Sequence, residues 1–172
     1  MGDDQRRLVV FDLDACCWYP EMYMLWGGGA PFKQCGTAPN NTLTDVQNTT
    51  CRLLGDVAAS WAELHRRVSA GEPIVVGIAS RSDEPAWARE CLRKFMVADG
   101  VSMMDVVGEE LCEIHKGSKR THFAALQKRT GIPFEPCASL TTTCPTSATW
   151  EALASTVSTR PTASRGFYST KA

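Results

Sequence analysis

Two acidic residues, Asp12 and Asp14, stand one residue apart at the end of a short hydrophobic run in the stretch LVVFDLDACCWYP. Neighbouring carboxylates repel one another unless a cation or a proton compensates their charge. Mg²⁺ could compensate this charge, because it binds one or two carboxylates together with water and phosphate oxygens. One carboxylate could then attack phosphorus while the other transfers protons. For D-x-D on its own, the alternative is a solvated turn, since Asp is common at such positions.

A hydroxyl and a guanidinium stand together in the stretch GIASRSDEP, where Ser80 and Arg81 follow a second hydrophobic run. A helix is expected to begin just after them, with Ser82 or Asp83 as its N-cap and Pro85 in its first turn. A strand end that leads into a helix start is a suitable place to hold phosphate oxygens. The alternative is a simple helix cap beside a surface arginine.

Two lysines, Lys116 and Lys119, occur near the expected start of a later helix in the stretch HKGSKRTHF. Cations are unfavourable at a helix N-terminus unless an anion lies close by. Lys119 is the better candidate for contact with such an anion. The alternative for both lysines is a solvated surface position.

Hydrophobic patterns predict the elements that must position these side chains. Three short hydrophobic runs have the character of buried strands: residues 8–11, 74–80 and, as a possible third, 103–108. Three segments have helical character: residues 56–73, 82–95 and 119–133. Strands that alternate with helices indicate an α/β fold, a parallel sheet with helices on both faces. Ligands bind such sheets at the carboxyl ends of the strands, so we expect both acidic residues to meet Ser80 and Arg81 there.

A segment rich in Gly, Asn, Thr and Pro, at about residues 26–55, separates the first strand from the first helix. We interpret it as a long loop or a small insertion that shapes the entrance to the site. It is too short for a large cap domain, so we expect a minimal cap. Residues 1–137 are then one domain, and residues 138–172 form an irregular tail.

Composition sets the broad class of the protein. The chain has 172 residues, 44% hydrophobic and 22% charged, and a net charge of −1. These values are typical of one globular domain without general attraction for nucleic acid or anionic membranes. The N-terminus does not resemble a signal peptide, and the eight cysteines include no C-x-x-C pair. We therefore expect a cytoplasmic monomer that binds no nucleic acid and no membrane.

Three stretches together resemble a known family: VVFDLDACCWYP, GIASRSDEPAWAR and GSKRTHFAALQKRTGIPFE. They are similar to the first three motifs of the haloacid dehalogenase superfamily, and within it to the magnesium-dependent phosphatase-1 family. The resemblance covers residues 8–135, apart from the loop region. It implies a Rossmann-like fold and a phosphatase that acts on phosphotyrosine-containing protein or on phosphorylated sugar adducts.

The resemblance also implies a role for each candidate residue. Asp12 would be the nucleophile that forms an aspartyl-phosphate, and Asp14 the general acid and base. Ser80 and Arg81 would bind the phosphate, and Lys119 would neutralise the phosphoaspartate. Mg²⁺ would be held by the Asp12 side chain and the backbone carbonyl of Asp14.

A fourth motif of the family, F-F-D-D-x-x-x-N, supplies an acid that completes the metal site. Here the corresponding stretch reads ASLTTTCPTSATW, with Thr141 and Thr142 where the acids are expected. A hydroxyl is a poor substitute for a carboxylate on Mg²⁺. The alternative function is therefore a catalytically impaired pseudoenzyme that binds phosphate.

The genetic code offers an explanation for the missing motif. With the frame moved back by one nucleotide, the codons of five residues permit F-F-D-D-x-x-x-N at the family's spacing: Ser139, Leu140, Thr141, Thr142 and Thr146. We hypothesise that the segment from about residue 138 onward is an out-of-frame translation. The alternative is a divergent Ser/Thr-rich tail.

The nucleotide sequence tests this hypothesis directly. We predict that the other frame encodes F-F-D-D-x-x-x-N from position 139 and then continues as an open reading frame. Sequencing the transcript across this region is the measurement. A stop codon within a few residues of the frame change would contradict the hypothesis.

Overall fold

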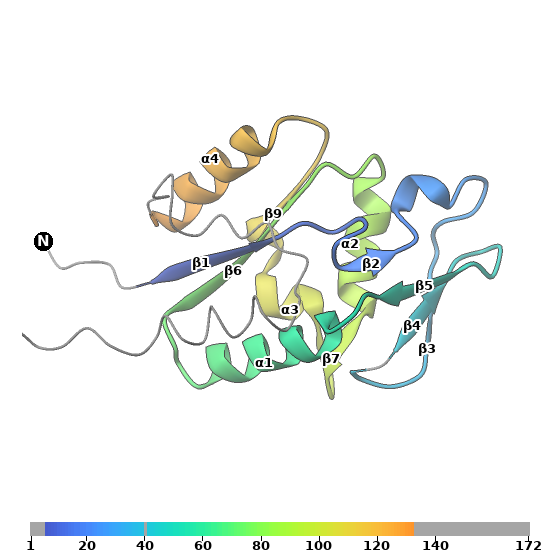
Figure 1. The fold of residues 1–172 in the computed structure, drawn as a ribbon, viewed down its shortest axis with the longest axis horizontal. Helices are drawn as coiled ribbons and strands as arrows, with labels where there is room; N and C mark the ends of the chain where they lie inside the picture. Colours follow the sequence, from blue (N-terminus) through green and yellow to red (C-terminus); the bar gives the residue numbers. More distant parts are fainter. Residues whose placement is uncertain (1–5, 40, 133–172) are drawn as a thin grey trace, which may run out of the picture.

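A parallel sheet of three strands runs through the part of the chain that the computed structural model describes, residues 6–39 and 41–132 (Figure 1). Its strands are β1 (Arg7–Phe11), β6 (Ile74–Ser80) and β9 (Cys112–Ile114). The order β1-β6-β9 puts β6 at the centre, with Val9 opposite Val76 and Ser80 opposite Ile114. Both pairings are parallel, so the three carboxyl ends share one edge. The strands expected at residues 8–11 and 74–80 are confirmed.

Four α-helices accompany this sheet among the described residues: α1 (Val57–Ser69), α2 (Pro85–Lys94), α3 (Met103–Val107) and α4 (Lys119–Thr130). α2 begins at Pro85, which suits the first helical turn because proline has no N–H to satisfy. α4 ends at Gly131, whose left-handed conformation (φ 71°) is easily adopted by glycine. The three expected helices are confirmed. The N-cap of α2 is a correction, since Glu84 stands there in place of Ser82 or Asp83.

Side chains alternate between the two faces of the sheet, and each face packs against different helices. Phe11 and Ile78 belong to a large hydrophobic cluster that includes Trp61 of α1. Val10 and Ala79 point the other way and pack with Leu126 of α4. Figure 1 shows α4 on one side of the sheet and α1 and α3 on the other. This arrangement confirms the Rossmann-like α/β architecture.

The third strand of the sheet is not where the sequence pattern placed it. Residues 103–107 form α3, so the strand predicted at 103–108 is wrong. Ser102 and Asp105 form a capping box, in which the Ser102 hydroxyl accepts from the Asp105 N–H and the Asp105 carboxylate accepts from the Ser102 N–H. This local arrangement favours a helix over a strand. The third strand is β9, only three residues long, with Glu113 at its centre.

The insertion between β1 and α1 contains regular structure. A second, antiparallel sheet has the order β2-β5-β4-β3 and consists of β2 (Trp18–Tyr19), β3 (Lys33–Cys35), β4 (Thr42–Thr44) and β5 (Thr50–Leu53). Shorter elements complete the described residues: the 3₁₀ turns η1 (Met22–Met24) and η2 (Glu109–Leu111), and the hairpin of β7 (Met96–Ala98) and β8 (Val101–Ser102). The segment read as loop-like therefore holds three short strands, which a Gly- and Thr-rich sequence conceals.

Buried polar contacts fasten this second sheet to the rest of the protein. The Asn41 side chain donates to the carbonyl of Met96 at 2.6 Å and accepts from the Met96 N–H at 3.1 Å. From α2, Glu90 accepts from the Phe32 N–H at 2.8 Å, and Lys94 donates to the Phe32 carbonyl. The insertion is thus held in a defined position beside the parallel sheet.

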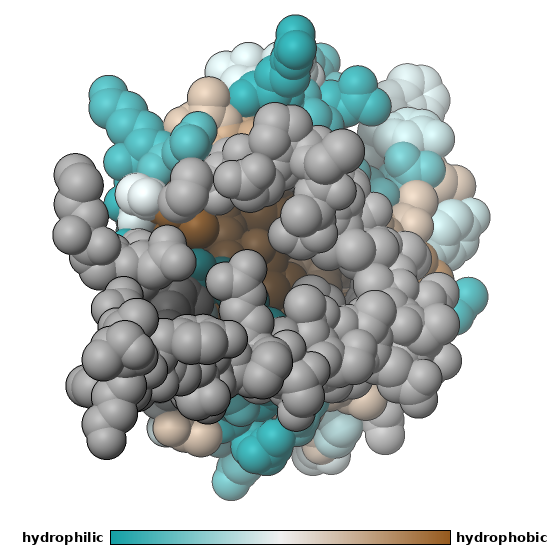
Figure 2. Space-filling view, turned by 60° about the vertical axis from the view of Figure 1, so that its left-hand side comes forward, coloured by the Kyte–Doolittle hydropathy of each residue, from teal (hydrophilic) through white to brown (hydrophobic). Residues whose placement is uncertain are grey.

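The hydrophobic core lies between the helices and the parallel sheet. Figure 2 turns the left-hand side of Figure 1 forward and shows hydrophobic residues at the centre of the view, with hydrophilic side chains at its rim. Within the described ranges, no helix combines the length and the hydrophobicity that crossing a bilayer requires. The boundary at residue 137 and the tail at 138–172 lie outside the described residues.

Replacing Asn41 tests whether these contacts hold the insertion. Asn41→Ala leaves a backbone N–H and a carbonyl of Met96 without their partner, so we predict a loss of roughly 1–3 kcal/mol in the free energy of unfolding. Urea denaturation followed by circular dichroism measures it. Gln34→Ala, at an exposed position on β3, is the matched control and should change stability by less than about 0.5 kcal/mol. Equal stability of the two variants would contradict the interpretation.

Candidate active site

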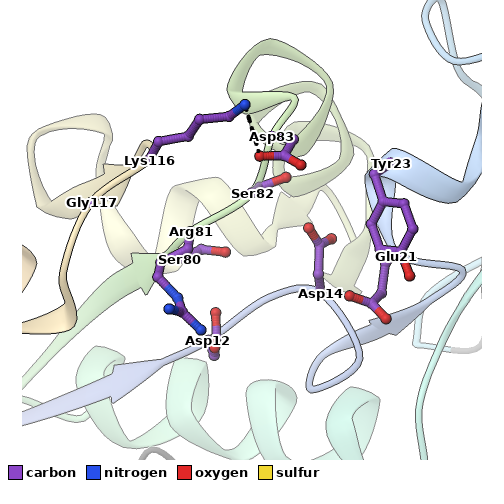
Figure 3. Close-up of a pocket in the computed structure, with 10 residues that line it drawn as sticks. All are labelled: Asp12, Asp14, Glu21, Tyr23, Ser80, Arg81, Ser82, Asp83, Lys116 and Gly117. Atoms are coloured by element: carbon purple, nitrogen blue, oxygen red, sulfur yellow. Dashed lines mark ion pairs between the residues drawn. The ribbon is translucent and has the colours of Figure 1, made fainter.

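A cavity of about 500 Å³ opens where β1 and β6 end (Figure 3). Its lining comes from three parts of the chain: the segment after β1, the end of β6 with the loop after it, and the loop between β9 and α4. The lining residues are Asp12, Asp14, Glu21, Tyr23, Ser80, Arg81, Ser82, Asp83, Lys116 and Gly117. Of the five residues to which the family resemblance assigned a role, all but Lys119 therefore line one cavity.

The fifth residue, Lys119, reaches Asp12 from the first turn of α4. Its ammonium nitrogen lies 2.7 Å from Oδ2 of Asp12 and also donates to the carbonyl of Ala79 on β6. The other carboxylate oxygen of Asp12 accepts from the Leu13 N–H at 2.9 Å. A lysine at a helix start is unfavourable alone, but here it has a carboxylate partner. The contact joins β1, β6 and α4 at one point.

Asp14 has a different set of side-chain partners from Asp12. Its Oδ1 accepts from the indole N–H of Trp18 at 2.9 Å and from the Met22 N–H at 3.2 Å. A tight turn follows Asp14, with Ala15 in the left-handed region at φ 57°. Neutral donors therefore hold the Asp14 carboxylate, while a lysine compensates Asp12.

The end of β6 and the loop after it bring two buried hydroxyls to the cavity. Ser80 is 1% exposed and Ser82 is 4% exposed, and neither hydroxyl oxygen has a hydrogen-bond partner among the described residues. Arg81, which stands between them, also lines the cavity and is exposed. Buried hydroxyls are normally hydrogen-bonded, so two unpartnered ones at a cavity wall indicate a place for a polar ligand.

The mouth of the cavity is bounded by an ion pair on one side and by an aromatic ring on another. Lys116 lies 3.2 Å from Asp83 and links the loop before α4 to the loop before α2. Figure 3 shows Tyr23 and Glu21, which come from the segment around η1, on the side of Asp14 away from this ion pair. The cavity thus has a wall rich in charged and hydroxyl groups and a wall with an aromatic side chain.

The loop before α4 is supported by a pair of histidines behind the cavity. A hydrogen bond with the carbonyl of Lys116 and another with the Glu113 carboxylate raise the pKa of His115. His122 is fully buried one turn into α4, and this burial lowers its pKa. Its Nε2 donates to the carbonyl of His115 at 3.1 Å, a direction that follows because a carbonyl only accepts. These contacts fix the loop that presents Lys116 and Gly117 to the cavity.

Exposed hydrophobic side chains are concentrated in the segment that contributes Tyr23 to the cavity. Five large hydrophobic side chains are exposed within the described residues, and four of them fall within one short segment: Tyr19, Tyr23, Met24 and Trp26. Tyr23 is 56% exposed and Trp26 is 92% exposed. We call these four residues the aromatic rim. Several exposed large hydrophobic side chains in one segment are typical of a binding surface.

The backbone below the aromatic rim is held by Asp45. Its carboxylate accepts from the Gly29 N–H at 3.1 Å, and a Cβ at Gly28 would come within 2.1 Å of its Oδ2. Burial opposes the ionisation of Asp45, but hydrogen bonds from three backbone N–H groups keep its pKa below the ordinary value. Gly27 accepts from the Gln47 side chain at 2.5 Å. The chain that follows Trp26 is therefore anchored while the indole ring stays exposed.

Sequence reasoning missed several residues that line the cavity. Tyr23 and Glu21 lie in the stretch EMYMLWGGG, where hydrophobic residues next to a glycine triplet could have signalled an exposed surface. Ser82 was interpreted only as a helix cap, and Asp83 as its alternative. Lys116 was weighed against Lys119 as an anion contact, and the structure places both near the cavity.

The residues present offer oxygen donors that suit a magnesium ion, because Asp12 and Asp14 line one cavity and could supply a side-chain carboxylate and a backbone carbonyl respectively. Within the described residues, no group of three or more His, Cys, Asp or Glu side chains could hold a metal by itself. Mg²⁺ is commonly bound by one or two carboxylates, with phosphate and water as the other ligands. The donor set therefore fits Mg²⁺ together with a phosphate. The positions expected for the fourth-motif acids, Thr141 and Thr142, lie outside the described residues.

Comparison with known proteins gives one match. The sequence model of the family described as Acid Phosphatase matches residues 5–138. A search of curated proteins found no match. The matched range covers most of the chain and all of the cavity-lining residues. It ends at the position where the hypothesised change of frame begins.

Proposed function

The chain belongs to the acid phosphatase family, a phosphatase family of the haloacid dehalogenase type, and from this premise we propose that it cleaves phosphate monoesters through a phosphorylated Asp12. One observation carries the proposal. Asp12 is paired with Lys119 and lines the same cavity as Asp14, Ser80 and Arg81. The residues proposed as nucleophile, proton donor and phosphate ligands are thus close enough to act on one substrate.

In the first step, a carboxylate oxygen of Asp12 attacks the phosphorus of the ester, and the bond from phosphorus to the leaving oxygen breaks. Asp14, in its protonated form, gives its proton to that oxygen and becomes a carboxylate. The products are the free alcohol and an aspartyl-phosphate at Asp12. Lys119 compensates the charge on Asp12 and on the phosphoryl group attached to it.

In the second step, water attacks the phosphorus of the aspartyl-phosphate. Asp14, now a carboxylate, removes a proton from that water and so returns to its protonated form. The bond between phosphorus and the Asp12 oxygen breaks and releases inorganic phosphate. Both acidic residues are then ready for another turnover.

Ser80 and Arg81 hold the phosphoryl oxygens during both steps. A guanidinium and a hydroxyl are strong donors to phosphate, and in a partly closed site their contribution is larger than in water. Bound Mg²⁺, held by the Asp12 side chain and the backbone carbonyl of Asp14, would neutralise phosphoryl charge and act as a Lewis acid. Its third protein ligand would come from the fourth motif, if the out-of-frame hypothesis is right.

The aromatic rim favours one of the two substrate classes that the resemblance implied. Tyr23 lines the cavity on the side away from the Lys116–Asp83 pair, and Trp26, three residues further along the chain, is largely exposed. Aromatic groups pack well against an aromatic leaving group, whereas a sugar needs several hydroxyl partners. We therefore propose an aryl phosphate of the phosphotyrosine type as the substrate.

Replacing the nucleophile and the metal tests the reaction. We predict that purified protein hydrolyses p-nitrophenyl phosphate with Mg²⁺ and that a chelator stops turnover until Mg²⁺ is restored. Asp12→Asn should lower kcat by on the order of 10³-fold or more, because the amide is not a nucleophile. Asp99→Asn, at an exposed turn that is not part of the cavity lining, is the control and should keep full activity. Phosphate binding without turnover in the wild-type protein would identify the pseudoenzyme instead.

Truncating the aromatic rim tests the substrate class. Tyr23→Ala and Trp26→Ala should each raise KM for p-nitrophenyl phosphate about threefold to tenfold, since an aromatic pair contributes about 0.5–1.5 kcal/mol. KM for a sugar phosphate should not change. Val46→Ala is the control, because Val46 is the exposed large hydrophobic residue outside the aromatic rim. Equal effects on both substrates would contradict the assignment.

A further inference from the structure

We propose that Ser82 is a second hydroxyl ligand of the phosphoryl group, acting beside Ser80 on the same cavity wall. The inference rests on the proposed function, because it assigns a further binding residue to the same site. The three-motif resemblance gives Ser82 no role, and the sequence pattern made it only a candidate helix cap. Three features of Ser82 support this role: its hydroxyl is buried, it has no hydrogen-bond partner among the described residues, and Ser82 lines the cavity.

Nothing in the described protein explains the burial of the Ser82 hydroxyl. Ser82 is 4% exposed, and its oxygen has no hydrogen-bond partner among the described residues. It does not cap α2, where Glu84 is the N-cap and makes no side-chain hydrogen bond. A buried hydroxyl that lacks a partner lowers the stability of the folded protein. Such a group is typically kept for a ligand or for function.

The position of Ser82 indicates what that ligand is. Ser82 lines the same cavity as Asp12, Asp14 and Ser80 (Figure 3). The hydroxyl of Ser80 is equally buried and unpartnered, and Ser80 is the residue that the proposed function assigns to phosphate. Two hydroxyls in the same unusual state, on either side of Arg81, indicate one shared ligand with several oxygens.

The chemistry of a phosphoryl group matches this pair of hydroxyls. Its oxygens are charged and each accepts more than one hydrogen bond, and hydrogen bonds from a hydroxyl to an anionic oxygen are among the strong ones. No described hydrogen bond holds either hydroxyl in its present rotamer. A serine side chain can therefore turn about χ1 toward a bound phosphate.

Ser102 shows what a buried structural serine looks like in this protein. It is 5% exposed, close to the value for Ser82. Its hydroxyl is fully engaged, however, since it donates to Asp105 Oδ2 at 2.6 Å and accepts from the Asp105 N–H at 3.2 Å. Ser82 and Ser102 are thus similarly buried, but only the Ser102 hydroxyl is hydrogen-bonded. Ser102 is therefore the control for the loss of a buried hydroxyl.

The experiment compares Ser82→Ala and Ser102→Ala in the full chain with Mg²⁺ present, using inorganic phosphate as the probe. Calorimetry gives the Kd for phosphate, and thermal denaturation without phosphate gives Tm. Ser82→Ala should raise Kd about tenfold or more, the loss expected for a hydrogen bond to a charged group, with Tm unchanged or higher. Ser102→Ala should lower Tm and leave Kd unchanged.

Each result has a defined meaning. An unchanged Kd in Ser82→Ala, with phosphate bound by the wild-type protein, would overturn the inference. A fall in Tm like that of Ser102→Ala would also overturn it, because it would show a structural role. Wild-type protein that binds phosphate without turnover would overturn the proposed reaction and leave the Ser82 comparison intact. Wild-type protein that neither binds phosphate nor hydrolyses the ester would overturn both.

Discussion

The ion pair between Asp12 and Lys119 is the contact on which the arrangement of the site depends. Asp12 follows the first strand of the parallel sheet and Lys119 begins the last described helix, so the pair joins two parts of the chain far apart in sequence. The lysine also donates to a carbonyl on the central strand. The Lys119 ammonium compensates the negative charge of a carboxylate at this strand end. The Asp12 carboxylate in turn compensates the positive charge of a lysine at a helix start. A phosphoryl group on Asp12 would lie within reach of the same cation.

The second sheet gives this site its specific surroundings. Hydrogen bonds through Asn41, Glu90 and Lys94 fasten it beside the parallel sheet, so it is a fixed wall. It is also linked to the acids themselves, because Asp14 accepts from Trp18 on β2. The segment that binds one carboxylate thus also carries the aromatic rim. Under the proposed function, the position of the proton-transferring Asp14 and the recognition of the leaving group would therefore depend on the same segment.

Sequence reasoning predicted the main strands and helices because their signals are local. The runs that became β1 and β6 are continuous and rich in valine, as strands buried on both faces are. It failed at residues 103–107, where a hydrophobic run suggested a strand but the Ser102–Asp105 capping box favoured a helix. It missed β9, which is short and carries Glu113. Asp12 could be identified from the sequence, because an acidic residue directly after a buried strand is itself a signal. Tyr23 could not, because its place in the cavity lining depends on tertiary structure that no local pattern encodes.

The most direct test of the central claim is to trap the phosphorylated protein. Protein mixed with a ³²P-labelled aryl phosphate and Mg²⁺ is quenched in acid during turnover, digested, and the labelled peptide is identified. The account predicts label on the peptide that contains Asp12, released by hydroxylamine as expected for an acyl phosphate, and no label in Asp12→Asn. Turnover that leaves no label on the protein, or label on a serine such as Ser80, would contradict it.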